Sequence, residues 1–370
     1  MKIKTANTIM TFPRGEEVIV YNYLSKAAIV CEHADLYWLA AAAEWKPIDS
    51  IVEAHPQFES DSLRQKIQSL IDTGIILQRG SAETEREADY TDNWELGKAA
   101  AMFHFTLNDC EFVSLEDSTQ KQKARAHSDP SPDLFRLNNG HAISLPKRHK
   151  WTRDSLFDVM SRRRSVRQVL REPIKFGDLA DCLHAGLGIT GFVKTETSVL
   201  PLKLTPSGGA RNPFEAYVWA RHVEGLESGI YHYSALQHSI ERVEKMTNSL
   251  PSEMLAGQDW ADDMAAIIFL VADLKRTSWK YSDPNAYRVI LIEAGHIAQN
   301  IMLACTANEL TACPTAALAH SKISELLGIK ALTTTPLYAL AIGKPGINTD
   351  AYVSVESVLA SASAAQHAMD

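Results

Sequence analysis

The stretch TPSGGARNPFEAYVWARH runs from Thr205 to His222 and sets a glycine pair, flanked by a serine and an arginine, directly before an apolar run. The aromatic and β-branched residues of that run predict a strand from Phe214 onward. Glycine lets a backbone come close to a ligand, and loop N–H groups beside an arginine attract anionic groups. The loop is not a P-loop, because no Gly-Lys-Ser/Thr follows, and it lacks the strand–loop–helix context of a dinucleotide-binding fingerprint. It therefore indicates close approach to a flat or anionic ligand, unless it only connects two strands.

Strand-like and helical stretches surround this loop. Strand character is found in GIYHYSA (229–235), HSIERV (238–243), AAIIFLVADL (265–274) and TPLYALAIGKPG (335–346). Helical periodicity is found in PIKFGDLADCLHAGLGI (173–189) and AYRVILIEAGHIAQNIMLACTANEL (286–310). The second helix is apolar nearly all round, so we expect it in the core or in a dimer interface. The alternation predicts an α+β domain with one sheet packed by helices.

Composition excludes several classes of function. The 370 residues are 45% hydrophobic and 22% charged, as in soluble globular proteins. The net charge of −8 argues against a dedicated nucleic-acid-binding protein. The longest apolar run, at 265–272, is far shorter than the ~20 residues that span a bilayer. Five cysteines without a CxxC pair support neither a zinc site nor a disulfide framework. We therefore expect a reduced, cytoplasmic protein that binds no metal, nucleic acid or membrane.

The N-terminal part of the chain has a different pattern. Residues 34–80 indicate three short helices and a strand, with Leu63, Ile67 and Leu70 at helical spacing before Gly74. This is the outline of a winged helix, a unit that often binds DNA, yet residues 31–80 contain eight acidic and four basic side chains. We therefore expect peptide or partner docking, or plain packing, rather than DNA binding. The predicted divisions are a docking module at 1–85, a lead-in segment with a polar, mobile loop at 86–150, the main domain at 151–350 and a C-terminal tail at 351–370.

Three further stretches carry groups suited to chemistry. RRRSVR at 162–167 places arginines at a helix end, where guanidinium groups either grip phosphate or are simply solvated. Lys280 and Tyr281 offer two proton carriers before the long helix, although most such pairs are surface residues. A lysine against apolar walls has a lowered pKa, which suits a general base. Glu293, His296 and Asn300 form one stripe of the long helix, which favours a structural histidine bonded within the core over a catalytic one.

The order of these motifs is more specific than any one of them. Arg-Arg-Ser-x-Arg at 163–167 is followed by Pro-Ser-Gly-Gly-Ala-Arg at 206–211, Gly-x-Tyr-His-Tyr, Trp-Lys-Tyr, Glu-Ala-Gly-His-x-x-Gln-Asn, Ala-Cys-Pro and Ile-Gly-Lys-Pro. This order, over residues 151–346, resembles the SagB-type dehydrogenases of the FMN-dependent nitroreductase superfamily. The N-terminal segment is similar to the extensions of the azoline oxidases that work on ribosomal peptides.

The resemblance implies a nitroreductase-like, FMN-binding α+β domain that forms an intertwined homodimer, with flavin sites at the interface. It also implies that Lys280 and Tyr281 are the catalytic pair. One departure concerns Glu309, which stands where the family usually has a glycine before the leucine of the Ala-Cys-Pro element. The residues that match the FMN-binding elements are Arg163, Arg164, Ser165, Arg167, Pro206, Ser207, Gly208, Gly209, Arg211, Thr311, Ala312 and Cys313.

The function that the resemblance implies is FMN-dependent oxidation of thiazoline or oxazoline rings to azoles in a ribosomally made peptide. One hydrogen would leave as a proton to Lys280 or Tyr281, and the other as a hydride to the flavin, which supplies the redox chemistry. The N-terminal module would hold the peptide or a biosynthetic partner enzyme. Two alternatives are an NAD(P)H-dependent flavin reductase or dehydrogenase acting on another small or peptide substrate, and a non-catalytic docking protein with a degenerate flavin fold.

Overall fold

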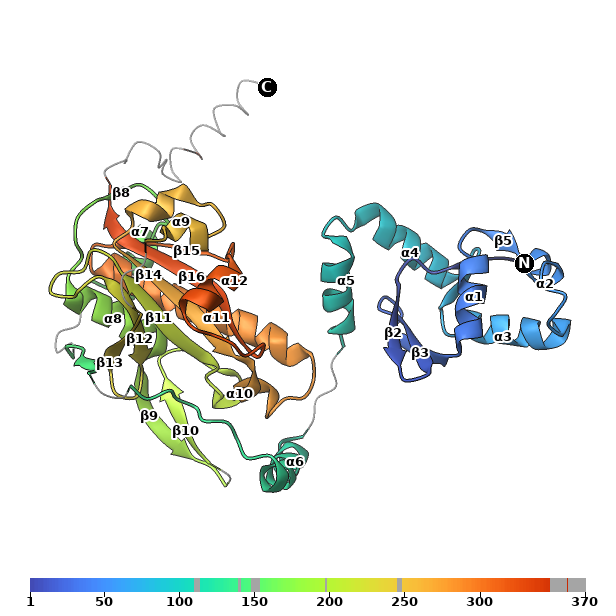
Figure 1. The fold of residues 1–370 in the computed structure, drawn as a ribbon, viewed down its shortest axis with the longest axis horizontal. Helices are drawn as coiled ribbons and strands as arrows, with labels where there is room; N and C mark the ends of the chain where they lie inside the picture. Colours follow the sequence, from blue (N-terminus) through green and yellow to red (C-terminus); the bar gives the residue numbers. More distant parts are fainter. Residues whose placement is uncertain are drawn as a thin grey trace. The chain divides into compact units, whose positions relative to one another are not determined.

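The chain divides into two compact units, Met1–Phe112 and Val113–Asp370 (Figure 1). The computed structural model describes residues 1–109, 114–138, 141–147, 154–196, 198–244, 248–346 and 358. The predicted tail at 351–370 lies outside the described residues, apart from Val358.

The first unit combines two small antiparallel sheets with helices. One sheet contains β1 (Lys2–Thr5), β5 (Lys46–Pro47) and β6 (Ile76–Gln78), and the other contains β2 (Ile9–Arg14), β3 (Glu17–Asn22) and β4 (Ala27–Cys31). The helices are α1 (His33–Ala41), α2 (Ile48–Glu53), α3 (Ser60–Asp72), α4 (Ala82–Asn93) and α5 (Gly97–Thr106). The predicted stripe of Leu63, Ile67 and Leu70 is buried on α3. Side chains of α4 and α5 pack around Tyr23, so this unit extends past the predicted boundary at residue 85.

The second unit is built around one eight-stranded antiparallel sheet, as the α+β pattern predicts. The strand order is β15-β16-β14-β11-β12-β13-β7, and β8 pairs with the far end of β16. The five strands expected between residues 214 and 346 are present. The strands are β7 (Ile143–Ser144), β8 (Val169–Leu170), β11 (Phe214–Ala220), β12 (Gly229–Ser234), β13 (Ser239–Glu244), β14 (Ala266–Asp273), β15 (Thr311–Thr315) and β16 (Thr334–Pro345).

Successive strand residues point to opposite faces of this sheet, and apolar side chains occur on both faces. Helices therefore cover both faces. Ile268 of β14 packs in the layer with α8 (Phe176–Leu187) and α11 (Asn285–Ala307). Its neighbour Phe269 packs in the opposite layer, which includes side chains of α9 (Pro251–Met254) and α12 (His320–Leu326). The two predicted helices α8 and α11 are thus confirmed, and they form the layer that carries the candidate site.

The 23-residue helix α11 is the core helix of this unit. By length and composition alone it is apolar enough to cross a membrane, the only such helix among the described residues. Its Ile290, Ile297 and Ile301 are buried in the layer shared with α8, as in the core of a globular protein. Leu291 and Ile292 are exposed on its other side, so the helix is not buried all round.

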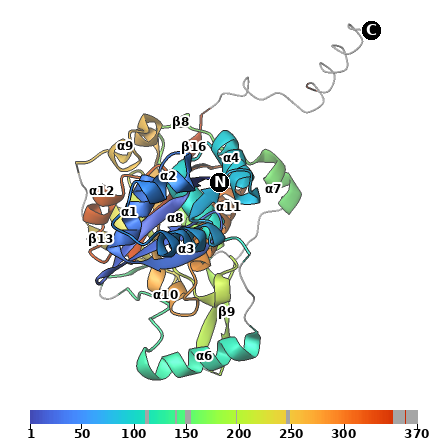
Figure 2. The same ribbon diagram turned by 90° about the vertical axis from the view of Figure 1, so that its right-hand side faces the viewer.

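The prediction of a mobile polar loop was wrong for residues 115–128. These residues form helix α6 (Leu115–Ser128), which lies beside the hairpin of β9 (Ile189–Lys194) and β10 (Val199–Lys203) (Figure 2). The backbone N–H of Asp117 donates to Ser114 Oγ over 3.0 Å, and Ser114 Oγ donates to the Asp117 carboxylate over 2.8 Å. Such a Ser-x-x-Asp pair caps a helix N-terminus. A polar composition therefore concealed a helix that begins with a clear cap.

Candidate active site

The glycine loop and the Lys-Tyr pair meet in space, although about seventy residues separate them in sequence. The loop forms a short turn, η1 (Gly208–Ala210), and the pair follows α10 (Leu274–Ser278). A Cβ atom placed on Gly209 would lie 2.6 Å from Tyr281 Oη and 2.7 Å from Lys280 Cδ. Only a residue without a side chain leaves room for both groups at this point. The two predicted elements therefore form one site, which we call the loop cluster (Ser207, Gly208, Gly209, Arg211, Lys280 and Tyr281).

The loop has a strained backbone that its own hydrogen bonds hold in place. Gly209, Ala210 and Asn212 have φ values of 60°, 54° and 48°, in the left-handed region. The backbone N–H of Asn212 donates to Ser207 Oγ over 2.8 Å, and the Asn212 side chain donates to the Ala210 carbonyl over 2.8 Å. Left-handed residues concentrate at ligand-binding sites, where surrounding contacts fix them.

Helix α11 packs against the loop through Glu293 and Val289. Ser207 Oγ donates to the Glu293 carboxylate over 2.8 Å, and Glu293 is only 5% exposed. Burial raises the pKa of Glu293 to about 7, although its bond with Ser207 and the charge of Lys203 oppose the rise. A Cβ atom on Gly208 would lie 2.6 Å from Val289 Cγ1, so this glycine allows the loop to lie directly on the helix.

Arg211 lies close to the Lys-Tyr pair and is 2% exposed. Its Nε donates to the Arg276 carbonyl over 2.7 Å, and its guanidinium stacks 4.9 Å from the centre of the Trp279 ring. Desolvation lowers the pKa of Lys280, and the positive charge of Arg211 lowers it further. Burial raises the pKa of Tyr281. The environment therefore makes Lys280 easier to deprotonate and Tyr281 harder to deprotonate, which suits proton transfer to the lysine.

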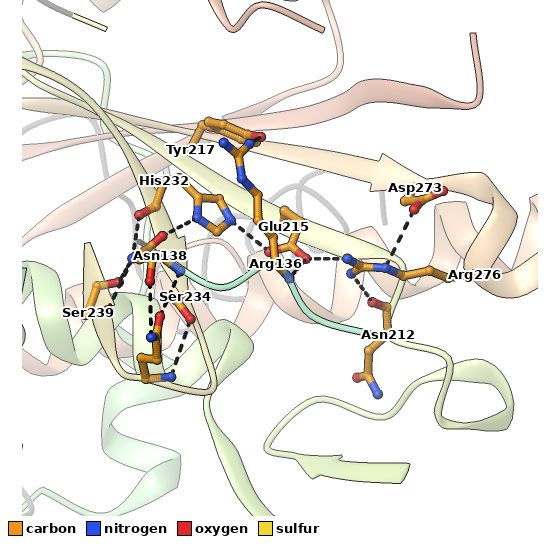
Figure 3. Close-up of polar contacts among 11 residues, drawn as sticks. Arg136, Asn138, Asn212, Glu215, Tyr217, His232, Ser234, Ser239, Asp273 and Arg276 are labelled. Carbon is orange, nitrogen blue, oxygen red and sulfur yellow. Dashed lines mark hydrogen bonds and ion pairs between the residues drawn. The ribbon is translucent and has the colours of Figure 1, made fainter. Parts of the chain in front are cut away.

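A buried polar network anchors the loop to α10. Glu215, at the start of β11, lies between His232 and Arg276, at 3.0 Å and 2.6 Å respectively (Figure 3). His232 Nδ1 is 2.7 Å from Asn138 Oδ1, and Arg276 Nη1 donates to the Asn212 carbonyl over 3.1 Å. Burial alone would raise the pKa of Glu215, but the His232 hydrogen bond and the Arg276 charge outweigh it, and the pKa is lowered. Glu215 is therefore a stable carboxylate that fixes the loop and the α10 segment together.

The predicted Arg-Arg-Ser-x-Arg element lies elsewhere in the unit. It follows helix α7 (Leu156–Arg162), and Val166 N–H donates to Thr311 Oγ1 over 3.2 Å. Burial raises the pKa of the Cys313 thiol, and the charge of neighbouring Arg167 opposes the rise. Lys344 pairs in register with Leu170 at this end of β16, and its ammonium group pairs with the Glu172 carboxylate over 3.0 Å. We call this group the arginine cluster (Arg163, Arg164, Ser165, Arg167, Thr311, Ala312, Cys313 and Lys344).

The two clusters lie at opposite ends of α11. The loop cluster contacts Val289 and Glu293, whereas β15 with Thr311 begins four residues after the helix ends at Ala307. At 1.5 Å per residue, Glu293 and Ala307 are about 21 Å apart along the helix axis. One chain therefore does not bring the two predicted FMN-binding elements together.

The stripe of Glu293, His296 and Asn300 does not bond internally, contrary to the prediction. Glu293 binds Ser207, whereas the Asn300 amide donates to Thr205 Oγ1 over 3.2 Å. His296 is exposed, because it falls outside the buried arc of α11. The stripe therefore fixes the segment before the glycine loop instead of forming a core network.

Comparison with known proteins identifies this architecture. The model of the nitroreductase family matches residues 160–344, half of the chain, and the chain belongs to this family. The nitroreductase homologue MJ1384 of Methanocaldococcus jannaschii is 33% identical over 194 residues, which cover 51% of this chain and 90% of MJ1384.

Two further relatives come from Rhizobium leguminosarum bv. trifolii. The trifolitoxin operon protein TfxC is 21% identical over 75% of this chain and 80% of its own length. The trifolitoxin-processing protein TfxB is 27% identical over 38% of this chain and 39% of its own length.

The protein is thus a flavin-dependent oxidoreductase, and FMN is its cofactor. Three observations fit this group. Gly209 lies directly against Lys280 and Tyr281, so a flat ring that binds at this loop would lie next to both groups. The arginine cluster carries three arginines on one short segment, and guanidinium groups suit a phosphate. β15 is an outer strand of the described sheet, so part of its backbone hydrogen-bonding capacity faces away from β16.

Proposed function

We propose that this protein oxidises thiazoline or oxazoline rings in a ribosomally made peptide to azoles. The observation that carries the proposal is the junction of Gly209 with Lys280 and Tyr281, where a glycine platform directly adjoins two proton carriers. Aromatisation of an azoline removes one proton and one hydride, so the reaction requires a base next to the flavin. The relationship to a trifolitoxin-processing protein supports a role in modifying a natural product.

In the proposed reaction, residues in and around the loop cluster have separate roles. Bound FMN supplies the hydride acceptor. Lys280, whose pKa burial and Arg211 lower, takes the ring proton as a neutral amine. Tyr281, whose pKa is raised, stays protonated and donates a hydrogen bond. Glu215 and Arg276 hold the two backbone segments at their observed separation.

We further propose that a complete site needs two copies of the chain. The separation of the two clusters along α11 supports this, because the resemblance assigns both to the same cofactor. A mixed dimer of a Lys280→Ala chain and an Arg163→Ala/Arg164→Ala chain should then contain one intact site. We expect about half of the wild-type turnover in purified mixed dimers and almost none in either parent. If each site lay within one chain, the mixed dimers would be as inactive as their parents.

The first unit is the proposed docking module for the peptide or for a biosynthetic partner enzyme, in the cytoplasm. β2 and β4 are the outer strands of their sheet, so each has one edge free of pairing with the other described strands of that sheet. An extended peptide can add to such an edge as a further strand. Deletion of residues 1–112 should therefore weaken turnover of a long precursor peptide but not of a short azoline.

The direct test begins with the visible spectrum of the purified protein and the mass of the released cofactor. The FMN-bound protein is then incubated with a thiazoline peptide, and loss of two hydrogens is followed by mass spectrometry. Lys280→Ala should abolish turnover with FMN still bound. Lys275→Ala is the matched control, because this lysine is exposed on α10. Equal turnover in both variants would remove Lys280 from its proposed role.

A second candidate function is NAD(P)H-dependent reduction of another small or peptide substrate. The 33% identity to a protein named as a nitroreductase favours it. Rapid anaerobic bleaching of the bound flavin by NADPH, without azoline turnover, would establish this function in place of the first.

A further inference from the structure

A cavity of about 320 Å³ opens over the junction of Gly209 and Lys280. Its floor includes these two residues with Arg211 and Trp279, and its walls come from two segments that lack any motif of the site. One wall is α6, with Ser118, Thr119 and Gln122. The other is the β9–β10 turn, with Thr195, Glu196 and Ser198. Cavities of this size hold small ligands or a short stretch of a larger one.

Helix α6 is fixed to the segment that carries the base. Arg125 Nη1 donates to the carbonyls of Ser278 and Trp279 over 3.1 Å and 2.7 Å. Trp279 Nε1 donates in return to the Asp129 carbonyl over 2.7 Å, just after the helix ends. Lys123 of α6 pairs with Glu196 of the opposite wall. These contacts close three sides of one pocket around Lys280.

The chemistry of the walls indicates what the pocket takes. The wall side chains are hydroxyls and an amide, together with the apolar Leu200 and a carboxylate that Lys123 neutralises. Gln122 Nε2 donates to Ser118 Oγ over 2.9 Å, and this bond uses one of the hydrogen-bonding positions of the amide. A side-chain amide has a donor and an acceptor spaced like those of a peptide group. The Thr195 and Ser198 hydroxyls already bond within the turn, so the amide of Gln122 is the wall group best placed to pair with a peptide group, which an apolar nitroaromatic or quinone lacks.

We propose that α6 is a wall of the substrate pocket and that Gln122 determines specificity by binding the peptide backbone beside the azoline ring. This inference rests on the proposed oxidation of azoline peptides and names the part of the substrate that is recognised. Neither the glycine loop nor the Lys-Tyr pair supplies this contact. Gln122 would thus select a ring inside a peptide over a free ring.

The chain offers a matched control on the same helix. Gln120 is exposed and does not line the pocket, so Gln120→Ala makes the same chemical change without the contact. Two probes are used with the full-length, FMN-bound protein: a thiazoline flanked by a glycine amide on each side, and 2-methylthiazoline. One neutral hydrogen bond is worth roughly 2–10-fold in kcat/KM. We expect Gln122→Ala to lower kcat/KM by about that factor with the peptide probe and by less than about twofold with 2-methylthiazoline. Gln120→Ala should leave kcat/KM unchanged with both probes.

A binding measurement separates this inference from the proposed reaction. The peptide carrying the finished thiazole is titrated calorimetrically into the FMN-bound wild type and both variants. Weaker binding to Gln122→Ala than to Gln120→Ala supports the wall even if no probe is oxidised, in which case only the proposed reaction fails. Equal binding and equal kcat/KM for the two variants, or no binding to the wild type, would overturn the role of Gln122.

Discussion

Replacement of Gly209 by alanine tests the contact on which the site depends. The new Cβ atom would lie 2.6 Å from Tyr281 Oη, 2.7 Å from Lys280 Cδ and 2.9 Å from Lys280 Nζ. Two half-buried side chains therefore have to move, since the backbone at Gly209 is held by the Asn212 bond to Ser207. The substitution perturbs the position of both proton carriers without removing either of them.

The expected loss of stability has two parts. The φ of 60° at Gly209 adds about 1 kcal/mol for any residue with a Cβ atom. Forcing two side chains off their preferred rotamers adds roughly 1–3 kcal/mol. Gly225→Ala isolates the first part, because Gly225 has a φ of 73° and no atom lies within 4 Å of the position that its new Cβ would take. We expect a loss of about 1 kcal/mol for Gly225→Ala and about 2–4 kcal/mol for Gly209→Ala.

The assay combines urea unfolding with turnover of a thiazoline peptide, at measured FMN occupancy. A shift of about 1 Å in a catalytic group can lower the rate about 100-fold. We therefore expect Gly209→Ala to lose turnover on that scale, whereas Gly225→Ala stays within about twofold of the wild type, because it touches neither carrier. If the two variants lose equal stability and both keep full turnover, the loop does not set the position of the pair.

Three further predictions concern the surroundings of the site. Glu309→Gly should raise the free energy of unfolding, measured in urea, by about 1 kcal/mol, because the exposed Glu309 has a left-handed φ of 58°. An unchanged free energy of unfolding would show that the backbone at Glu309 is not strained. Glu293 has a pKa of about 7 when folded against 4.5 in its ordinary state, so the folded protein holds a proton that the unfolded chain releases between these values. Stability should therefore fall by about 3 kcal/mol as pH rises through this window and Glu293→Gln should remove the slope, so an equal slope in both proteins would contradict the assignment. The hydrogen bond with Cys305 and, after it, burial raise the pKa of Cys182. Cys182 should therefore react with a disulfide reagent far more slowly in the folded protein than after unfolding, and equal rates would contradict its burial.

The sequence sufficed for elements with a strong period. The strands β11, β12, β14 and β16 and the helices α8 and α11 follow from apolar patterns that a single sheet with two covered faces requires. Residues of α6 gave no such pattern, because its contacts are polar: Arg125 and Trp279 hold it through backbone carbonyls. The Ser114–Asp117 cap was the available signal for this helix.

Contacts between distant segments were beyond single-sequence reasoning. The motif order predicted that the glycine loop and the Lys-Tyr pair belong to one site, but not that Glu293 holds Ser207 or that Glu215 bridges His232 and Arg276. These pairs depend on strand register and on the rotation of α11, and neither leaves a local pattern. The same holds for the separation of the two clusters, which only the length of α11 reveals.

The Glu215–Arg276 pair is better explained by geometry than by stability. Burying two charges costs desolvation that their attraction repays only in part, so an apolar pair of similar volume would serve a core equally well. Arg276 does more than pair with Glu215, because its Nη1 binds the Asn212 carbonyl and its own carbonyl accepts the Arg211 side chain. Arg276, four residues before Lys280, thus binds both residues that directly follow the turn containing Gly209. An apolar substitute could fill the space but could not make these directional bonds, and the base would then move independently of the loop that receives the cofactor.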